Sequence, residues 1–123
     1  IKDRTIAGHN VDFDIGFLNA SIKRYNLQYD FGKRKIDQHA LVYAHMLKRG
    51  LRPPVKDGVS NIHSELVMEY VGIPPEPKPH RAIHGAMYET EALSRLILGE
   101  SRIDLFSDYS VPEYLKQDNR QEH

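Results

Sequence analysis

The feature that most constrains this chain is a short strand-like segment that leads directly into an amphipathic helical pattern. Residues 3–8 end in an apolar run, which the polar pair His9 and Asn10 interrupts. Over residues 12–26 the apolar side chains recur at the spacing of an α-helix. Asp14 lies at this strand-to-helix junction, and open α/β folds bind their ligands where strands end. The segment therefore predicts an α/β fold with a functional edge near residue 14.

The same periodicity predicts the elements that follow along the chain. Asp37 precedes a helical pattern, where its carboxylate either caps the helix or orients a substrate, and we favour the cap. Ser60 is expected to cap a later helix. Four prolines within residues 73–79 exclude a helix there, because proline lacks a backbone N–H. The elements expected after the first helix are a strand over 35–37, helices over 38–48, 61–71 and 80–98, and a loop over 49–58.

Composition bounds the class of protein. The chain has 123 residues, of which 40% are hydrophobic and 28% charged, and this fits one globular domain. Its 17 basic and 17 acidic residues cancel, so only a local basic groove remains as an electrostatic argument for nucleic acid. The lack of cysteine excludes disulfides and thiolate metal sites, and it agrees with a reducing, cytoplasmic location. No apolar run approaches the ~20 residues of a membrane span, so no membrane partner is expected.

The chain divides into a patterned part and a C-terminal extension. Residues 1–99 carry the strand and helix patterns, whereas residues 100–123 lose periodicity and are expected to end in disorder. The chain begins at Ile1 in what resembles the middle of a domain, and only two strands are expected against four helices. We therefore expect N-terminal strands to be missing. The extension is expected to drape over the domain through Leu105, Phe106, Tyr109 and Tyr114, and the first helix to bury Phe13, Phe17 and Leu18.

Two segments far apart in the chain resemble a nuclease family. His9-Asn10-x-x-Phe13-Asp14-x-x-Phe17-Leu18 and His80-x-Ala82-x-x-x-Ala86 are similar to two of the three motifs of the DEDDh 3′-5′ exonucleases. These are the DnaQ-like proofreading and RNA-trimming enzymes of the RNase H-like superfamily. The resemblance spans residues 4–98. It implies an RNase H-like α/β fold, in which helices flank a mixed sheet.

The resemblance also implies a metal-dependent site. Two Mg²⁺ or Mn²⁺ ions would bind carboxylates at the sheet edge and clamp the scissile phosphate, because hard cations prefer oxygen ligands. Asp14 matches a catalytic metal ligand. His80 matches the general base, a task that suits an imidazole whose pKa lies near neutrality. The residues expected to contact the substrate are His9, Asn10, Phe13 and Arg81.

The chain departs from the family pattern in two places. The opening Asp-x-Glu motif is absent, so these 123 residues alone are expected to be inactive. The last motif is normally His-x-x-x-x-Asp, but Gly85 stands where the acid belongs. Glu89 lies one turn further along the same helix face, and its longer side chain is a candidate to replace the missing metal ligand. His84 is a weaker candidate, and a zinc pair of His80 and His84 is disfavoured because the HExxH pattern is absent.

These patterns favour one function and leave one alternative. The favoured function is a 3′-5′ exonuclease, which hydrolyses phosphodiester bonds at the 3′ end of DNA or RNA by a two-metal mechanism with a histidine general base. Its partner would be nucleic acid with a free 3′ end, single-stranded or frayed, and the protein partners considered are a polymerase and a second copy of the chain. The alternative is a catalytically degenerate member that keeps the fold as a binding or scaffold module. Gly85 supports that alternative.

Overall fold

The strands of the molecule form two small, separate sheets. The computed structural model describes residues 4–117, and within them each sheet has two strands. In the first sheet β1 (Ile6–Gly8) and β2 (Lys35–Asp37) run parallel, with Gly8 opposite Asp37. In the second, β3 (Val55–Lys56) and β4 (Val59–Ser60) form an antiparallel hairpin. The α/β class is confirmed, and the described residues hold a parallel pair and a hairpin, whereas the mixed RNase H-like sheet stays a prediction.

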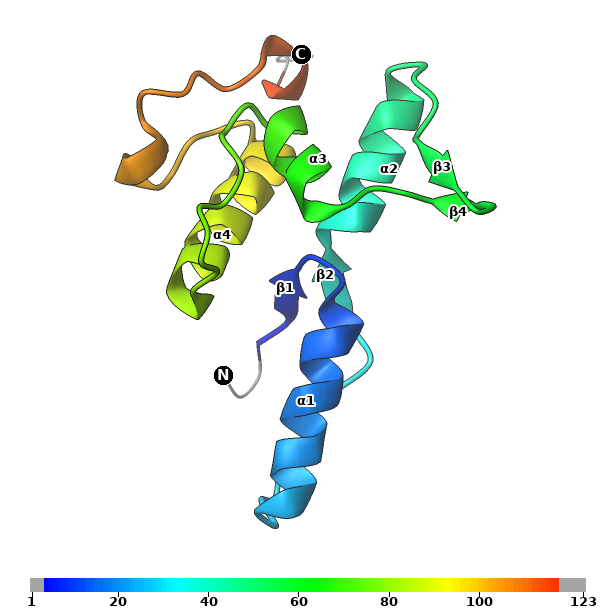
Figure 1. The fold of residues 1–123 in the computed structure, drawn as a ribbon, viewed down its shortest axis with the longest axis vertical. Coiled ribbons are helices and arrows are strands. Elements are labelled where there is room, and N and C mark those ends of the chain that lie inside the picture. Colours follow the sequence, from blue (N-terminus) through cyan, green and yellow to red (C-terminus); the bar gives the residue numbers. More distant parts are fainter. Residues whose placement is uncertain (1–3, 118–123) are drawn as a thin grey trace, which may run out of the picture.

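Four α-helices and two short 3₁₀ helices surround these strands in residues 4–117. Figure 1 shows α1 extending away from the parallel pair on one side, while α2, α3 and α4 gather on the other. Helix α1 contacts both β1 and β2, and α4 contacts β1. The helices are α1 (Val11–Arg24), α2 (Gln38–Lys48), α3 (Ser64–Tyr70) and α4 (Ala82–Leu98), with 3₁₀ helices η1 (Asp104–Phe106) and η2 (Glu113–Leu115).

Most of the expected elements are present, but the segment before α3 differs. The expected strand over 35–37 and helix over 38–48 are confirmed at both ends. The loop expected over 49–58 contains β3, and Ser60 belongs to β4 instead of capping a helix. The N-cap of α3 is His63, whose Nδ1 accepts a hydrogen bond from the Leu66 backbone N–H at 3.2 Å. The hairpin takes up the residues that would have formed the first turn of the expected helix.

The hydrophobic core lies among α2, α3, α4 and the segment that follows α4. Phe106 is 1% exposed and its ring packs edge-on against Tyr88, with 4.7 Å between ring centroids. Phe106 therefore anchors the extension as expected, and Tyr114 also packs on the domain, with 5.2 Å between its ring centroid and that of Tyr70, while Leu105 and Tyr109 are exposed. The buried core residues are Val42, Met46, Ile62, Val67, Met68, Tyr70, Val71, Ile73, Tyr88, Ala92, Phe106 and Leu115.

The first helix is not part of this core, and the expectation for its apolar side chains was wrong. Phe13 is 67% exposed and Phe17 is 64% exposed, and Leu18 is also exposed. Val11 is the one fully buried residue of α1. A helix of 14 residues is ~21 Å long, whereas strands of three residues span only ~10 Å. The parallel pair is therefore too short to cover the apolar face of α1.

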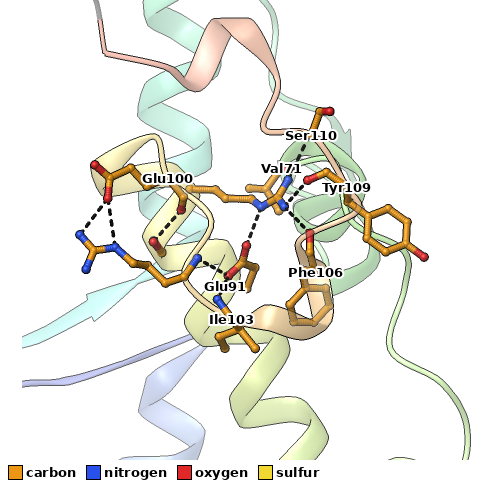
Figure 2. Close-up of polar contacts among 10 residues, drawn as sticks. Val71, Glu91, Glu100, Ile103, Phe106, Tyr109 and Ser110 are labelled. Carbon is orange, nitrogen blue, oxygen red and sulfur yellow. Dashed lines mark hydrogen bonds and ion pairs between the residues drawn. The ribbon is translucent and has the colours of Figure 1, made fainter.

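A buried ion pair fastens the segment after α4 to that helix (Figure 2). Arg95 and Glu91 are both fully buried, with 3.0 Å between Arg95 Nε and Glu91 Oε1. The Arg95 guanidinium also donates to backbone carbonyls, and the Glu91 carboxylate accepts from the backbone N–H groups of Arg102 and Ile103. A buried charge is tolerated when it is paired and hydrogen-bonded in this way. The carbonyls that accept from Arg95 are those of Val71, Phe106, Tyr109 and Ser110.

Candidate functional site

The corner between β1 and α1 is held by a carboxylate from β2. Asp37 accepts hydrogen bonds from the backbone N–H groups of Asn10 at 3.1 Å and Val11 at 2.9 Å. It also accepts from the His39 backbone N–H at 3.0 Å, which makes it the N-cap of α2. Asn10 adopts the left-handed conformation and makes no side-chain cap of its own. The cap predicted for Asp37 is confirmed, and the same carboxylate also satisfies the first N–H groups of α1.

Glu89 of α4 reaches this corner from the opposite side. A Cβ placed on Gly8 would lie 3.0 Å from Glu89 Oε2, so the absent side chain of Gly8 leaves room for the carboxylate. Gln38 fixes the backbone at this point, because its buried Nε2 donates to the Glu89 carbonyl at 2.7 Å. The last residue of β1 and the first residue of α2 thus both position Glu89.

The electrostatics around Glu89 favour its neutral form. Partial burial raises the pKa of the Glu89 carboxyl above its usual value of 4.5, and a hydrogen bond from the His9 backbone only partly opposes this effect. The negative charges of Asp14, Glu76 and Asp37 raise the pKa further. A cation between these carboxylates would remove that penalty, because an opposite charge favours the ionised form.

His80 belongs to a neighbouring group on the N-terminal side of α4. Its Nδ1 lies 3.3 Å from Glu76 Oε2, and its side chain is 68% exposed. A Cβ placed on Gly85 would lie 3.7 Å from both carboxylate oxygens of Glu76. The space beside Gly85 is therefore taken by Glu76, and Glu89 lies instead against β1. A small cavity of about 100 Å³ is lined by residues of both groups, including Glu76, His80, Gly85 and Glu89.

The residues expected to contact a substrate are divided among three places. His9 and Asn10 line a cavity of about 390 Å³ between the β1–α1 corner and the segment before α3. Phe13 lies on the exposed face of α1, where its ring is 4.9 Å from that of Phe17, centroid to centroid. Arg81 is the exposed N-cap residue of α4. The structure brings His9 and Asn10 together and places Phe13 and Arg81 on other exposed surfaces.

Two residues of this region were not predicted from the sequence. Glu76 lies in the proline-rich connection, for which the sequence predicted only that no helix forms. Its one sequence signal is the four-residue step to His80. Gln38 has no such signal, because its partner is 51 residues away. Within residues 4–117, no three His, Asp or Glu side chains gather closely enough to hold a metal ion together.

Comparison with protein-family models, with curated proteins and with solved structures found no match to this chain. Among residues 4–117, no helix is both long enough and apolar enough to cross a membrane.

Proposed function

We propose that this chain is part of a metal-dependent 3′-5′ exonuclease domain with an RNase H-like fold. The observation that carries the proposal is the position of Glu89 at the end of β1, where partial burial, together with the negative charges of Asp14 and Glu76, raises its pKa. Perturbed carboxyl groups at a strand end are typical of catalytic sites. The resemblance of the two motifs also implies that carboxylates at the sheet edge bind the metal ions, and Glu89 lies at that edge.

Asp14 and Glu89 would hold a Mg²⁺ or Mn²⁺ ion. The donors fit such an ion in kind, because carboxylate oxygens are the ligands that hard cations prefer. In number they fall short within residues 4–117, where no group of three ligands is gathered. The family places further acids in an Asp-x-Glu motif that this chain lacks. When bound, the ion supplies Lewis acidity toward a phosphate oxygen.

Two histidines, His80 and His84, are candidates for the general base. His80 was assigned by its spacing to Gly85, and Glu76 holds its Nδ1 side, which leaves Nε2 free to accept a proton. The same His-x-x-x-x-acid spacing also joins His84 to Glu89. If Glu89 is the metal ligand, this second spacing assigns the proton transfer to His84. A comparison of the two single variants decides between these assignments.

The second candidate function is a degenerate domain that binds nucleic acid without cleaving it. Gly85 favours this candidate, because the position where the motif has its acid carries no ligand atom. The two functions differ in what a divalent metal does. The degenerate domain would bind its partner equally well with and without the ion.

The test is mononucleotide release from labelled single-stranded DNA and RNA by the full-length protein that contains this chain. We expect release that depends on Mg²⁺ or Mn²⁺ and proceeds from the 3′ end. Asp14→Asn and Glu89→Gln should each reduce the rate at least a hundredfold, since each removes a charged ligand. Asp108→Asn, an exposed acid in the segment after α4, should leave the rate unchanged. His84→Ala and His80→Ala are compared in the same assay.

Two outcomes would contradict the proposal. One is a folded full-length protein that releases no nucleotide with either metal. The other is a Glu89→Gln variant with undiminished activity and unchanged Mn²⁺ affinity, measured by calorimetry. The first outcome with intact nucleic acid binding would favour the degenerate domain.

A further inference from the structure

The cavity at the β1–α1 corner is built almost entirely from histidine, asparagine and serine residues. It has a volume of about 390 Å³, which lies within the usual range of small-ligand sites. Two of its sides come from the β1–α1 corner and the first turn of α2, and the third comes from β4 and the segment before α3. The lining residues are His9, Asn10, His39, Ser60, Asn61, Ile62 and His63.

The hydrogen bonds around this cavity hold its walls in place. His39 Nε2 lies 2.7 Å from Ser60 Oγ, which joins α2 to β4. The Asn61 backbone N–H donates to the Pro54 carbonyl at 2.7 Å, which fixes the base of the hairpin. His63 Nδ1 accepts from the Leu66 backbone, so in the neutral ring Nε2 carries the hydrogen and acts as a donor. The side-chain amides of Asn10 and Asn61 supply both donors and acceptors.

These groups are poorly suited to an anion. No Lys or Arg side chain lines the cavity. Helix N-termini often bind phosphate through free backbone N–H groups. Here the Asp37 carboxylate already accepts from the first N–H groups of α1 and from His39 at the start of α2. A phosphate at this corner would therefore meet a carboxylate in place of free donors.

The same groups suit a nucleobase. A carboxamide presents a donor beside an acceptor, and this pair matches the hydrogen-bonding edge of a base. The cavity also adjoins the proposed metal site, because His9 lines the cavity and its backbone donates a hydrogen bond to Glu89. Asn10 is the N-cap of α1, and Asp14 lies in the first turn of the same helix. A nucleotide could thus place its base in the cavity and its phosphate beside Asp14.

We propose that this cavity binds the base and sugar of a substrate nucleotide, with Asn10, Asn61 and His63 as the groups that recognise it. This inference rests on the proposed function, because it assigns the neighbouring carboxylates to the phosphate.

The test follows the side-chain resonances of the histidines and asparagines by NMR in the 123-residue chain, without divalent metal. The probes are adenosine, cytidine, guanosine and uridine, with inorganic phosphate and zinc chloride titrated separately. At least one nucleoside should give saturable shifts confined to the cavity residues. Asn61→Ala should weaken this binding about tenfold, since it removes the amide hydrogen bonds. Gln28→Ala removes an exposed amide that does not line the cavity, and it should leave nucleoside binding unchanged.

Three outcomes would overturn the inference. The first is that no nucleoside gives a saturable shift while the spectrum remains that of a folded chain. The second is that phosphate gives shifts equal to those from nucleosides, and the third is that zinc binds at the histidines while no nucleoside binds. The inference and the proposed function fail separately. Asp14→Asn should keep nucleoside binding while it abolishes nucleotide release. Asn61→Ala with normal release and an unchanged KM would contradict the cavity assignment alone.

Discussion

At the scale of single residues, the Asp37 carboxylate stabilises the local structure where β1, α1 and α2 meet. Its carboxylate meets three backbone N–H groups, those of Asn10, Val11 and His39. Partial burial acts to raise the pKa of Asp37, but these three hydrogen bonds and the charge of His9 outweigh it, so the pKa lies below its usual value of 3.8. The ionised carboxylate therefore stabilises the folded chain.

Asp37→Ala should destabilise the chain by about 2 kcal/mol at neutral pH, because it removes an N-cap and two further backbone hydrogen bonds. Since the pKa is lowered on folding, this stabilisation is present above the unfolded pKa of about 3.8 and is lost as pH falls through the folded value. Urea unfolding at about pH 7 and about pH 2.5 measures both effects. The difference between variant and parent should shrink at the lower pH.

Asp37→Asn is the matched control, because an amide oxygen still accepts hydrogen bonds at an N-cap. It should retain part of the stability and lose the dependence on acid. A difference between Asp37→Ala and the parent that stays constant from neutral to acidic pH would show that the charge of Asp37 is not involved.

At the scale of elements, α1 behaves differently from the other helices. It has the strongest aromatic pattern in the sequence, yet its aromatic side chains contact little besides each other. The core is built by α2, α3, α4 and the η1 and η2 turns. The apolar face of α1 is therefore an exposed surface in residues 4–117, and its side chains contribute little to the stability of these residues.

Phe17→Ala should consequently change the free energy of unfolding by less than about 1 kcal/mol, as surface substitutions usually do. Phe106→Ala removes the same ring from the core and should cost about 3–5 kcal/mol. Chemical denaturation of the two variants provides the comparison. Equal losses at the two positions would mean that α1 is packed in solution in a way that its exposure does not indicate.

Sequence patterns predicted elements better than they predicted which faces are buried. Strand 35–37 and helix 38–48 are local features, marked by Asp37 as a cap and by regular apolar spacing. The hairpin was missed because each strand has only two residues, and its Asp57-Gly58 turn was interpreted as a loop. Burial depends on what else is present to cover a face, and periodicity carries no information about that.

At the scale of the whole molecule, contacts between distant segments position the candidate site. Gln38 and Glu89 meet across 51 residues, and Asp37 meets Val11 across 26. The motifs predicted that Asp14 belongs to a site, and they suggested Glu89 as a candidate ligand. They did not predict that Glu89 would lie against Gly8, or that Glu76 would lie beside Gly85. Such pairings follow from the tertiary fold and have no local sequence signal.

The buried pair of Arg95 and Glu91 lies within α4, and each of its side chains also hydrogen-bonds to a segment outside that helix. Arg95→Met should destabilise the chain by about 3–5 kcal/mol, because it leaves the Glu91 charge buried without its partner. Arg102→Met, which breaks the exposed pair with Glu100, should change stability by less than about 1 kcal/mol. Urea unfolding followed by circular dichroism measures both. A small loss at Arg95 would show that water reaches the pair.

The Arg95 guanidinium also restricts how the chain after α4 can dock. Its acceptors come from the end of α3, from Phe106 in η1, and from the run Tyr109–Ser110 before η2. If that run docked one residue out of register, the carbonyls would turn away and a cation would remain buried without partners. An apolar side chain in the same place would tolerate such a slip. The buried charge thus favours one alignment of the segment after α4 over other alignments of similar shape.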